Sequence, residues 1–537
     1  MKYIFSLLAV CCLLQSRAND YPVTVRGRVF GCDFTGQTLR KFPLMGAKVE
    51  LVDSDADGSQ LFDDVMGTAV VNPDGTFEVS GTGGDPGNYS WSRPDVYVRF
   101  VYNYYDKVRL TDELDRTRYA NTPEHDHNDF EGILDIGTWT LENDLSQGES
   151  SQASVWFEVC RAWDDYVNIK GEEPAAGHCD VEYWSAIFAG TPWTSDNTIH
   201  WPIHYDCRSA KHEFGHLIRH SFDGDRDHFN WDVTRFRYAR SHSQCAGDCN
   251  NWSTESTSMN EAYAFNEGWA EFWAREYYCP MNYSSECEGG VAYLLREIEG
   301  KLKQTMAEPR AFMCQVLKNN PDVIHSIGMF ITKMNELAGQ TLYDAQKPMI
   351  IGAKSEQAPI GSKIPPQAAS TYHGQQLGQI DVELKRVNEK LGQGGGIKSR
   401  MLMKTVNSTS PTESAVNSSG LTATRNLLLL QQEIIQRNGD ITEDVLNQKR
   451  SDNSIDAYMN ELRNNYNARL NQVIDQAYKD AISKLQSTDS PTPYSNALIA
   501  DIQSKWSLQK GERGGGTGAN RFSYSLYAPV SVVKDEQ

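Results

Sequence analysis

The chain has 537 residues, with 71 acidic against 51 basic side chains and a formal net charge of −20. A chain of this length exceeds what one hydrophobic core usually organises, so we expect two globular domains and additional segments. The acidic balance argues against nucleic-acid phosphates and anionic membrane surfaces as partners.

The N-terminus has the pattern of a secretory signal peptide. A basic start at Lys2 is followed by an apolar run from Tyr3 to Leu14 and by the small-x-small sequence Ser16-Arg17-Ala18. We predict a signal peptide over residues 1–18 and a secreted, extracellular product. No later stretch approaches the roughly 20 apolar residues that span a bilayer, so we predict no transmembrane segment. The C-terminal sequence KDEQ resembles an ER-retrieval signal with Gln in place of Leu, which leaves secretion as the default.

The cysteines point to the same compartment. Cys11 and Cys12 leave with the signal, and eight of the nine that remain lie between residues 160 and 314. In an oxidising compartment this clustering predicts a disulfide-stapled domain, with one cysteine left over. A metal site at Cys245 and Cys249 is the alternative. Sequons for N-glycosylation occur at Asn88, Asn251, Asn282, Asn407 and Asn417.

Residues 20–143 have the pattern of short β-strands. Apolar residues alternate with polar ones, and Asn72-Pro73-Asp74-Gly75 supplies turn chemistry between two strands. We predict an all-β sandwich. The expected strands include residues 23–29, 47–52, 76–79 and 96–101.

The order of these signals carries a resemblance. The segments VTVRGRVFGC, GAKVELVDSDADG, NPDGTFEVSG and PDVYVRFVY together resemble the transthyretin-like domain of secreted animal proteins. The resemblance implies a sandwich that serves binding or spacing and carries no chemistry of its own.

One loop of this region has the spacing of a calcium site. Asp53, Asp55, Asp57 and Gly58 match the start of a calcium-binding loop, and Asp64 stands where the bidentate Glu would be. The flanking segments are expected strands, so an EF-hand is excluded. We favour a solvated acidic turn and keep Ca²⁺ as the alternative.

Residues 145–340 change to helical periodicity with many Trp, Tyr and Cys residues, and we expect a mainly helical α+β domain there. Helices are predicted at 155–167 and 291–304. Residues 341–420 are predicted to be a flexible linker, since they are rich in Gly, Ser, Gln and Pro. A helical appendage is expected at 421–487, and a disordered tail at 488–537.

The sequence His-Glu-Phe-Gly-His at residues 212–216 carries the first part of the chemistry. On a helix, positions i and i+4 project from one face, so His212 and His216 can reach one ion with Glu213 beside them. Phe214, Leu217 and Ile218 make the opposite face apolar.

A second helix carries the other part. Phe265, Trp269 and Phe272 make the segment FNEGWAEFW apolar over most of its circumference, so this helix should be largely buried. Glu267 and Glu271 lie on one stripe of it. Buried carboxylates need cationic or donor partners, and a metal ion for Glu267 with a histidine N–H for Glu271 would supply both.

These two segments resemble the gluzincins, zinc metallopeptidases with HExxH followed on a second helix by N-E-x-x-x-[DE]. The resemblance implies one Zn²⁺ held by His212, His216 and Glu267, with Glu213 as general base and Glu271 orienting a ligand histidine. The metzincin pattern is excluded by Arg219 and Phe222. A third ligand from Asp223, Asp225 or Asp227, as in aspzincins, stays open.

Three protein ligands leave an open position for water, whose pKa the metal lowers toward about 7. Glu213 would take its proton, and the hydrolysis of peptide bonds is the natural reaction. A further donor is needed for the tetrahedral intermediate, for which His242 and Tyr263 are candidates. Tyr238 and Arg240 are others in the same interval.

The segment 198–205 reads as a strand just before the metal helix, where a substrate could align along a sheet edge. We take His200 and His204 in it as structural. The function predicted first is therefore a secreted zinc metallopeptidase acting on a peptide or protein. Two alternatives are a non-catalytic, zinc-stabilised extracellular binding protein and a hydrolase of non-peptide amides or esters.

Overall fold

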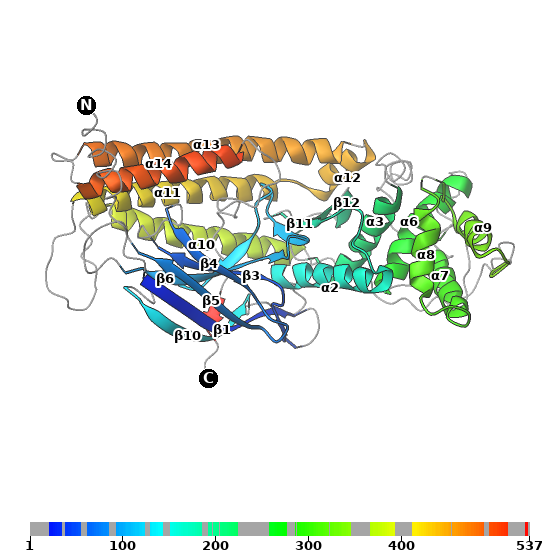
Figure 1. The fold of residues 1–537 in the computed structure, drawn as a ribbon. Coiled ribbons are helices and arrows are strands. Elements are labelled where there is room, and N and C mark those ends of the chain that lie inside the picture. Colours follow the sequence, from blue (N-terminus) through cyan, green and yellow to red (C-terminus); the bar gives the residue numbers. More distant parts are fainter. Residues whose placement is uncertain are drawn as a thin grey trace, which may run out of the picture.

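The computed structural model describes residues 21–34, 38–54, 62–84, 93–123, 129–142, 151–184, 192–195, 197–202, 205–223, 257–275, 285, 287–321, 323–344, 366–392, 411–452, 454–487, 493–513 and 532–534. They form a multidomain chain with a β-sheet region from the N-terminal part and a mostly helical C-terminal part (Figure 1). This division agrees with the fold class predicted from the sequence.

Two sheets form the N-terminal region and share one core. The strand β1 pairs in parallel with β10 and antiparallel with β2 and β5. Phe77 of the first sheet meets Phe100 of the second edge-on, with ring centroids 5.4 Å apart. The predicted strands are confirmed, whereas the transthyretin-like identity stays a prediction. The first sheet contains β1 (Tyr21–Asp33), β2 (Arg40–Pro43), β5 (Thr76–Gly83), β10 (Gly132–Leu141) and β14 (Val532–Lys534), and the second β3 (Lys48–Asp53), β4 (Asp64–Val70), β6 (Val96–Val101) and β9 (Tyr119–Asn121).

A third sheet joins strands from both sides of residue 143, where the sequence suggested a domain boundary. Its order is β12-β13-β11-β8-β7, and the parallel pairing of β8 with β11 makes the link. The predicted strand before the metal helix is confirmed over Thr198–Trp201. Among the described strands β12, not β13, lies at the edge, so the expectation that this strand forms the sheet edge is wrong. The strands are β7 (Asn103–Tyr104), β8 (Val108–Thr111), β11 (Cys179–Tyr183), β12 (Trp193–Ser195) and β13 (Thr198–Trp201).

Helices beside the third sheet form the second part of the main core. Trp156 of α2 is fully buried and donates a hydrogen bond to the carbonyl of Val108 in β8 at 3.2 Å. The helices predicted at 155–167 and 291–304 correspond to α2 and α7. The elements are α2 (Gln152–Lys170), a 3₁₀ turn η1 (Cys207–Ser209), α3 (Ala210–Asp223), α6 (Thr257–Ala274), α7 (Glu288–Leu302), α8 (Pro309–Lys318) and α9 (Ile327–Ala338).

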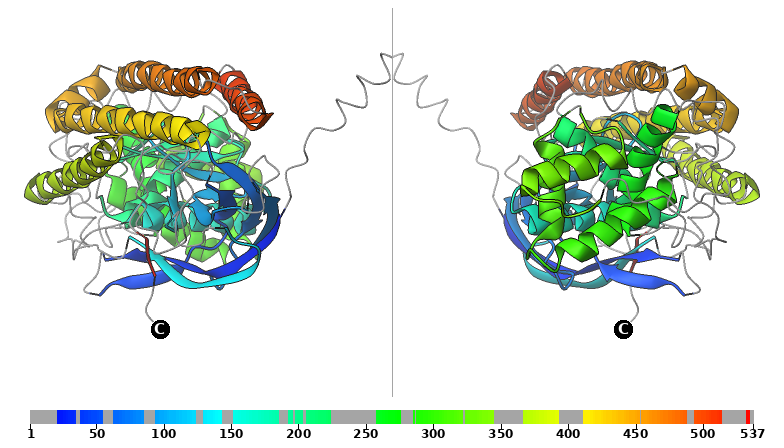
Figure 2. Two further views of the ribbon diagram at one scale, coloured as in Figure 1. Left: turned by 90° about the vertical axis from the view of Figure 1, so that its left-hand side faces the viewer. Right: turned by 90° about the vertical axis from the view of Figure 1, so that its right-hand side faces the viewer.

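The C-terminal helices form a layer on the side away from β1 and β10 (Figures 1 and 2). Three of them differ from the predicted boundaries: α10 lies in the expected linker, α11 begins inside that linker at Pro411, and α14 lies in the expected disordered tail. The helices α10 and α14 bury apolar side chains that their polar composition obscured, with Val387 of α10 and Ile502 of α14 almost fully buried. The helices are α10 (Pro366–Gly392), α11 (Pro411–Gly439), α12 (Glu443–Ser451), α13 (Ile455–Gln486) and α14 (Pro493–Arg513).

The end of the chain returns to the N-terminal region. The strand β14 pairs antiparallel with β10, with Val533 opposite Thr140. This strand is a second departure from the predicted disordered tail, because its ladder partner lies far away in the sequence. Among the described residues, no helix combines the length and apolar character that crossing a bilayer requires.

The cysteines differ from the expected disulfide framework. Cys160, Cys179 and Cys314 are buried free thiols, whereas Cys287 is disulfide-bonded. The first three lie in the apolar core between α2, β11 and α8, where they act as small apolar side chains. Cys245, Cys249 and Cys279 lie outside the described residues, as do four of the five sequons.

Candidate metal centre

The helix α3 presents the first pair of site residues. It follows η1 directly, and the Asp206 side chain accepts from the backbone N–H of Arg208 at the start of that turn. Phe214 is fully buried and contacts Trp163 of α2, with ring centroids 6.2 Å apart. Burial of this apolar face directs His212 and His216, one turn apart, toward α6.

The helix α6 presents the carboxylates. Phe265, Trp269 and Phe272 are fully buried, which confirms the prediction of a largely buried helix. Glu267 and Glu271 are only 2% and 3% exposed. The two carboxylates therefore lie out of water on the stripe that faces α3.

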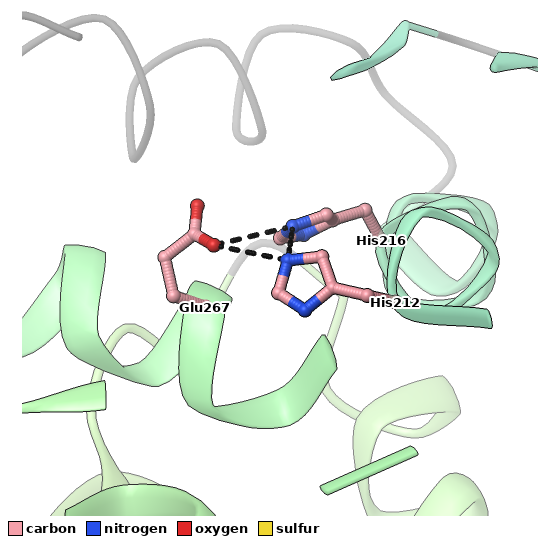
Figure 3. A group of neighbouring side chains, drawn as sticks. All are labelled: His212, His216 and Glu267. Atoms are coloured by element: carbon pink, nitrogen blue, oxygen red, sulfur yellow. Dashed lines mark hydrogen bonds and ion pairs between the residues drawn. The ribbon is translucent and has the colours of Figure 1, made fainter. Parts of the chain in front are cut away.

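His212, His216 and Glu267 converge on one point (Figure 3). The two imidazole Nε2 atoms are 3.1 Å apart, and they lie 3.3 Å and 3.4 Å from Oε2 of Glu267. Donor atoms bound at 2.0–2.1 Å around a tetrahedral ion would be about 3.3–3.4 Å apart. The three observed separations are therefore close to those expected between three donor atoms of one tetrahedral metal ion.

Glu271 approaches the other nitrogen of His212. Its Oε1 lies 3.5 Å from Nδ1 of that ring, on the side away from the converging Nε2 atoms. Burial by itself lowers the pKa of His212, but interactions with Glu267 and Glu271 outweigh it and hold the pKa well above its ordinary value. Surroundings that favour a proton on this ring also favour a metal cation at the same place.

Glu213 is held by a residue that the sequence did not single out. The hydroxyl of Thr194 in β12 lies 2.9 Å from Oε2 of Glu213 and 2.9 Å from its backbone carbonyl. Glu213 is 6% exposed and stands outside the group of three converging donors. No local signal could have identified Thr194, because β13 and η1 separate its short strand from the helix that carries Glu213.

The other predicted site residues have varied outcomes. Tyr263 is a buried residue of α6, one turn before Glu267, and its role as a donor stays a prediction. His242 lies outside the described residues, as do Tyr238 and Arg240. A further donor for the tetrahedral intermediate therefore stays a prediction.

The alternative metal ligands and the proposed calcium loop lie partly within the described residues. Asp223 is the last residue of α3, and the described group of converging ligands contains Glu267 in the third position. Asp225 and Asp227 lie outside the described residues. In the acidic turn, Asp53 accepts a hydrogen bond from the backbone N–H of Asp95 at 2.9 Å, which is a structural role. Residues 55, 57 and 58 of the proposed calcium loop lie outside the described part.

No family model matches the chain, and no curated protein matches it. The solved structures that match include two weak likenesses. A 9R-lipoxygenase from Cyanothece PCC8801 matches with 16% identity and a TM-score of 0.15, over 31% of this chain and 27% of the lipoxygenase. Yeast LTA4 hydrolase in complex with bestatin matches with 9% identity and a TM-score of 0.20, over 91% of this chain and 97% of that one. The described geometry supplies a His₂Glu group able to hold a metal ion.

Proposed function

We propose that this protein is a zinc-dependent hydrolase that cleaves peptide bonds. His212, His216 and Glu267 hold the metal, and Glu213 is the general base. The observation that carries the proposal is the triangle of two imidazole nitrogens and one carboxylate oxygen with edges of 3.1, 3.3 and 3.4 Å. Two histidines and one glutamate form a ligand set typical of catalytic zinc, which keeps its fourth position open.

Zinc bound there supplies a Lewis acid that polarises a carbonyl group and makes water more acidic. The protein's own side chains would transfer the proton and orient the ligands. Glu213 takes a proton from the attacking water and returns it to the leaving amine, while Thr194 fixes the orientation of its carboxylate. Glu271 accepts from Nδ1 of His212 and so directs Nε2 of that ring toward the metal.

The position of Glu213 favours an enzyme over a zinc-stabilised binding protein. A structural zinc site is closed by four protein ligands and needs no adjacent base. Here the described ligands number three, and a buried carboxylate is held next to them by Thr194 without taking part in the triangle. This arrangement matches the needs of a hydrolytic site.

The test combines metal analysis with an assay on a broad peptide library. Wild type and Glu213→Gln should each bind one zinc ion, and the variant should lose about 10²–10⁴-fold in kcat/KM, the range typical of a general base. Glu261→Gln serves as the matched control, because Glu261 is a half-buried glutamate of α6, and this variant should remain active. Equal activity of wild type and Glu213→Gln would favour the binding protein instead. Zinc retained by a His212→Ala, Glu267→Ala double variant would refute the ligand assignment.

We also propose that the protein acts after export. The charged and apolar pattern of residues 1–18 supports export. Cleavage before Asn19 would then remove these residues as a signal peptide. Expression in a eukaryotic secretory host should give mature protein in the medium. Mass spectrometry should find an N-terminal peptide that starts near residue 19. Retention of the intact N-terminus on cytosolic protein would contradict export.

A further inference from the structure

A chain of three hydrogen-bonded side chains crosses the third sheet. Oγ of Ser195 lies 2.7 Å from Nε2 of His200, and Nδ1 of His200 lies 2.6 Å from Oε2 of Glu182. The strand register produces this alignment. His200 of β13 is directly opposite Glu182 of β11, and Ser195 lies at the end of the neighbouring strand β12. A hydroxyl, an imidazole and a carboxylate therefore lie in a hydrogen-bonded row.

These three side chains are separate from the metal centre. Successive side chains of a strand point to opposite faces of the sheet. Thr194 points to the face of the sheet where α3 lies, because its hydroxyl contacts Glu213. Trp193 and Ser195 therefore point to the opposite face. That face is covered by the C-terminal helices, since Trp193 belongs to the apolar cluster formed mainly by α11, α13 and α14.

The base is held in a fixed orientation. The ring of Trp193 stacks on His200, with centroids 4.6 Å apart and an angle of 18° between the planes. Glu182 is almost fully buried and also pairs with Arg463 of α13. Burial raises the pKa of Glu182, but His200 and Arg463 lower it more, to about 2, so this carboxylate is ionised at neutral pH.

These contacts set the direction of proton donation. An ionised carboxylate can only accept, so Nδ1 of His200 must carry a hydrogen that it donates to Glu182. In the neutral imidazole, Nε2 is then the acceptor and the Ser195 hydroxyl is the donor. A hydroxyl that donates to an oriented imidazole is the arrangement of an activated serine nucleophile. Ser195 is also the half-buried member of the three, whereas His200 and Glu182 are buried.

We propose that Ser195, His200 and Glu182 form a second, metal-independent catalytic site that hydrolyses carboxylic esters. Ser195 Oγ attacks the carbonyl carbon and gives its proton to Nε2 of His200. The ester C–O bond then breaks, and the alcohol leaves with that proton, which gives an acyl-serine. Water attacks the acyl group in the same way, releases the carboxylic acid and restores the Ser195 hydroxyl.

Two measurements on the full-length protein test this site. The first is covalent labelling by a fluorophosphonate probe, located by peptide mass spectrometry. The second is hydrolysis of p-nitrophenyl acetate. Both are repeated with a zinc chelator and in Glu213→Gln, so that failure of the metal site is distinguished from failure of this one. Ser80→Ala is the matched control, because Ser80 is an exposed serine whose hydroxyl contacts Thr24 and no histidine.

The expected result is one label per chain on Ser195 and an ester hydrolysis that persists under chelation. Ser195→Ala should lose the label and at least 100-fold in ester kcat/KM, whereas Ser80→Ala should match wild type. His200→Gln should slow labelling of Ser195 by a similar factor, and thermal melting shows whether each variant is folded. If His200→Gln fails to fold, the Ser195→Ala result decides alone. Absence of label on Ser195 in folded wild type, or equal ester hydrolysis in the two serine variants, overturns the proposal.

Discussion

A Cβ atom placed on Gly215 would lie 2.9 Å from the Cα of Ala270, so α3 and α6 meet there with no side chain between them. Gly215 lies within the HEFGH segment, and Ala270 lies between Glu267 and Glu271. This close approach sets the spacing between the two histidines and the glutamate ligand.

The variant Gly215→Ala should therefore weaken metal binding. The added methyl group meets backbone, so the helices must separate, at an expected cost of about 1–3 kcal/mol in stability. We expect zinc affinity to fall at least about tenfold, measured by competition with a chromogenic chelator. Gly300→Ala is the control: Gly300 lies in α7 with nothing within 4 Å of an added Cβ, so it should stabilise by about 0.5–1 kcal/mol. Unchanged zinc affinity in Gly215→Ala would show that the helix spacing does not control the site.

Thr194→Val should lower turnover without removing the metal. The change deletes the hydroxyl that contacts Oε2 of Glu213 and leaves the carboxylate without that fixed orientation. We expect kcat/KM to fall about tenfold, which corresponds to about 1.4 kcal/mol of transition-state stabilisation, with zinc content intact. Thr332→Val, which removes an exposed hydroxyl hydrogen-bonded within α9, should leave kinetics unchanged. Loss of zinc in the Thr194 variant would mean that Thr194 supports the metal site as a whole.

Glu267 and Glu271 should differ in what they contribute to metal binding. Glu267→Ala removes a proposed ligand and should abolish stoichiometric zinc. Glu271→Gln removes only the carboxylate partner of His212 Nδ1, so we expect zinc affinity to fall about 10–100-fold. Titration with zinc-buffered solutions separates these two results. Equal losses in both variants would contradict the assignment of one ligand and one orienting residue.

Glu182 gives a prediction for stability against pH. The folded-state pKa of Glu182 lies below its ordinary value, so its ionised carboxylate stabilises the fold. This stabilisation is complete above about pH 4.5 and is lost as the pH falls through about 2. A lowering from 4.5 to about 2 corresponds to about 3 kcal/mol. Glu182→Gln should therefore lower the free energy of unfolding in urea by about that amount at pH 7, and the difference should shrink between pH 4 and pH 2.

The control for this measurement is Glu78→Gln, which changes an exposed glutamate on β5 and should have little effect. A constant difference between wild type and Glu182→Gln across this pH range would indicate that the loss comes from packing alone. A difference near zero at pH 7 would show that the buried pairs with His200 and Arg463 contribute no net stability.

The sequence by itself determined the features that depend on local periodicity. Alternating apolar residues identified the N-terminal strands, the four-residue spacing placed His212 and His216 on one helix face, and the apolar circumference of α6 required Glu267 to be buried. These patterns repeat within a few residues. They need no knowledge of distant neighbours.

Only the tertiary structure decided which distant segments meet. It brought Glu267 within 3.4 Å of both histidines, placed Thr194 against Glu213, and paired β8 with β11 across the expected domain boundary. It also showed that α10 and α14 bury enough apolar surface to form helices in segments whose composition is polar. Such contacts depend on how helices and strands pack, because a side chain far away in the sequence completes each of them.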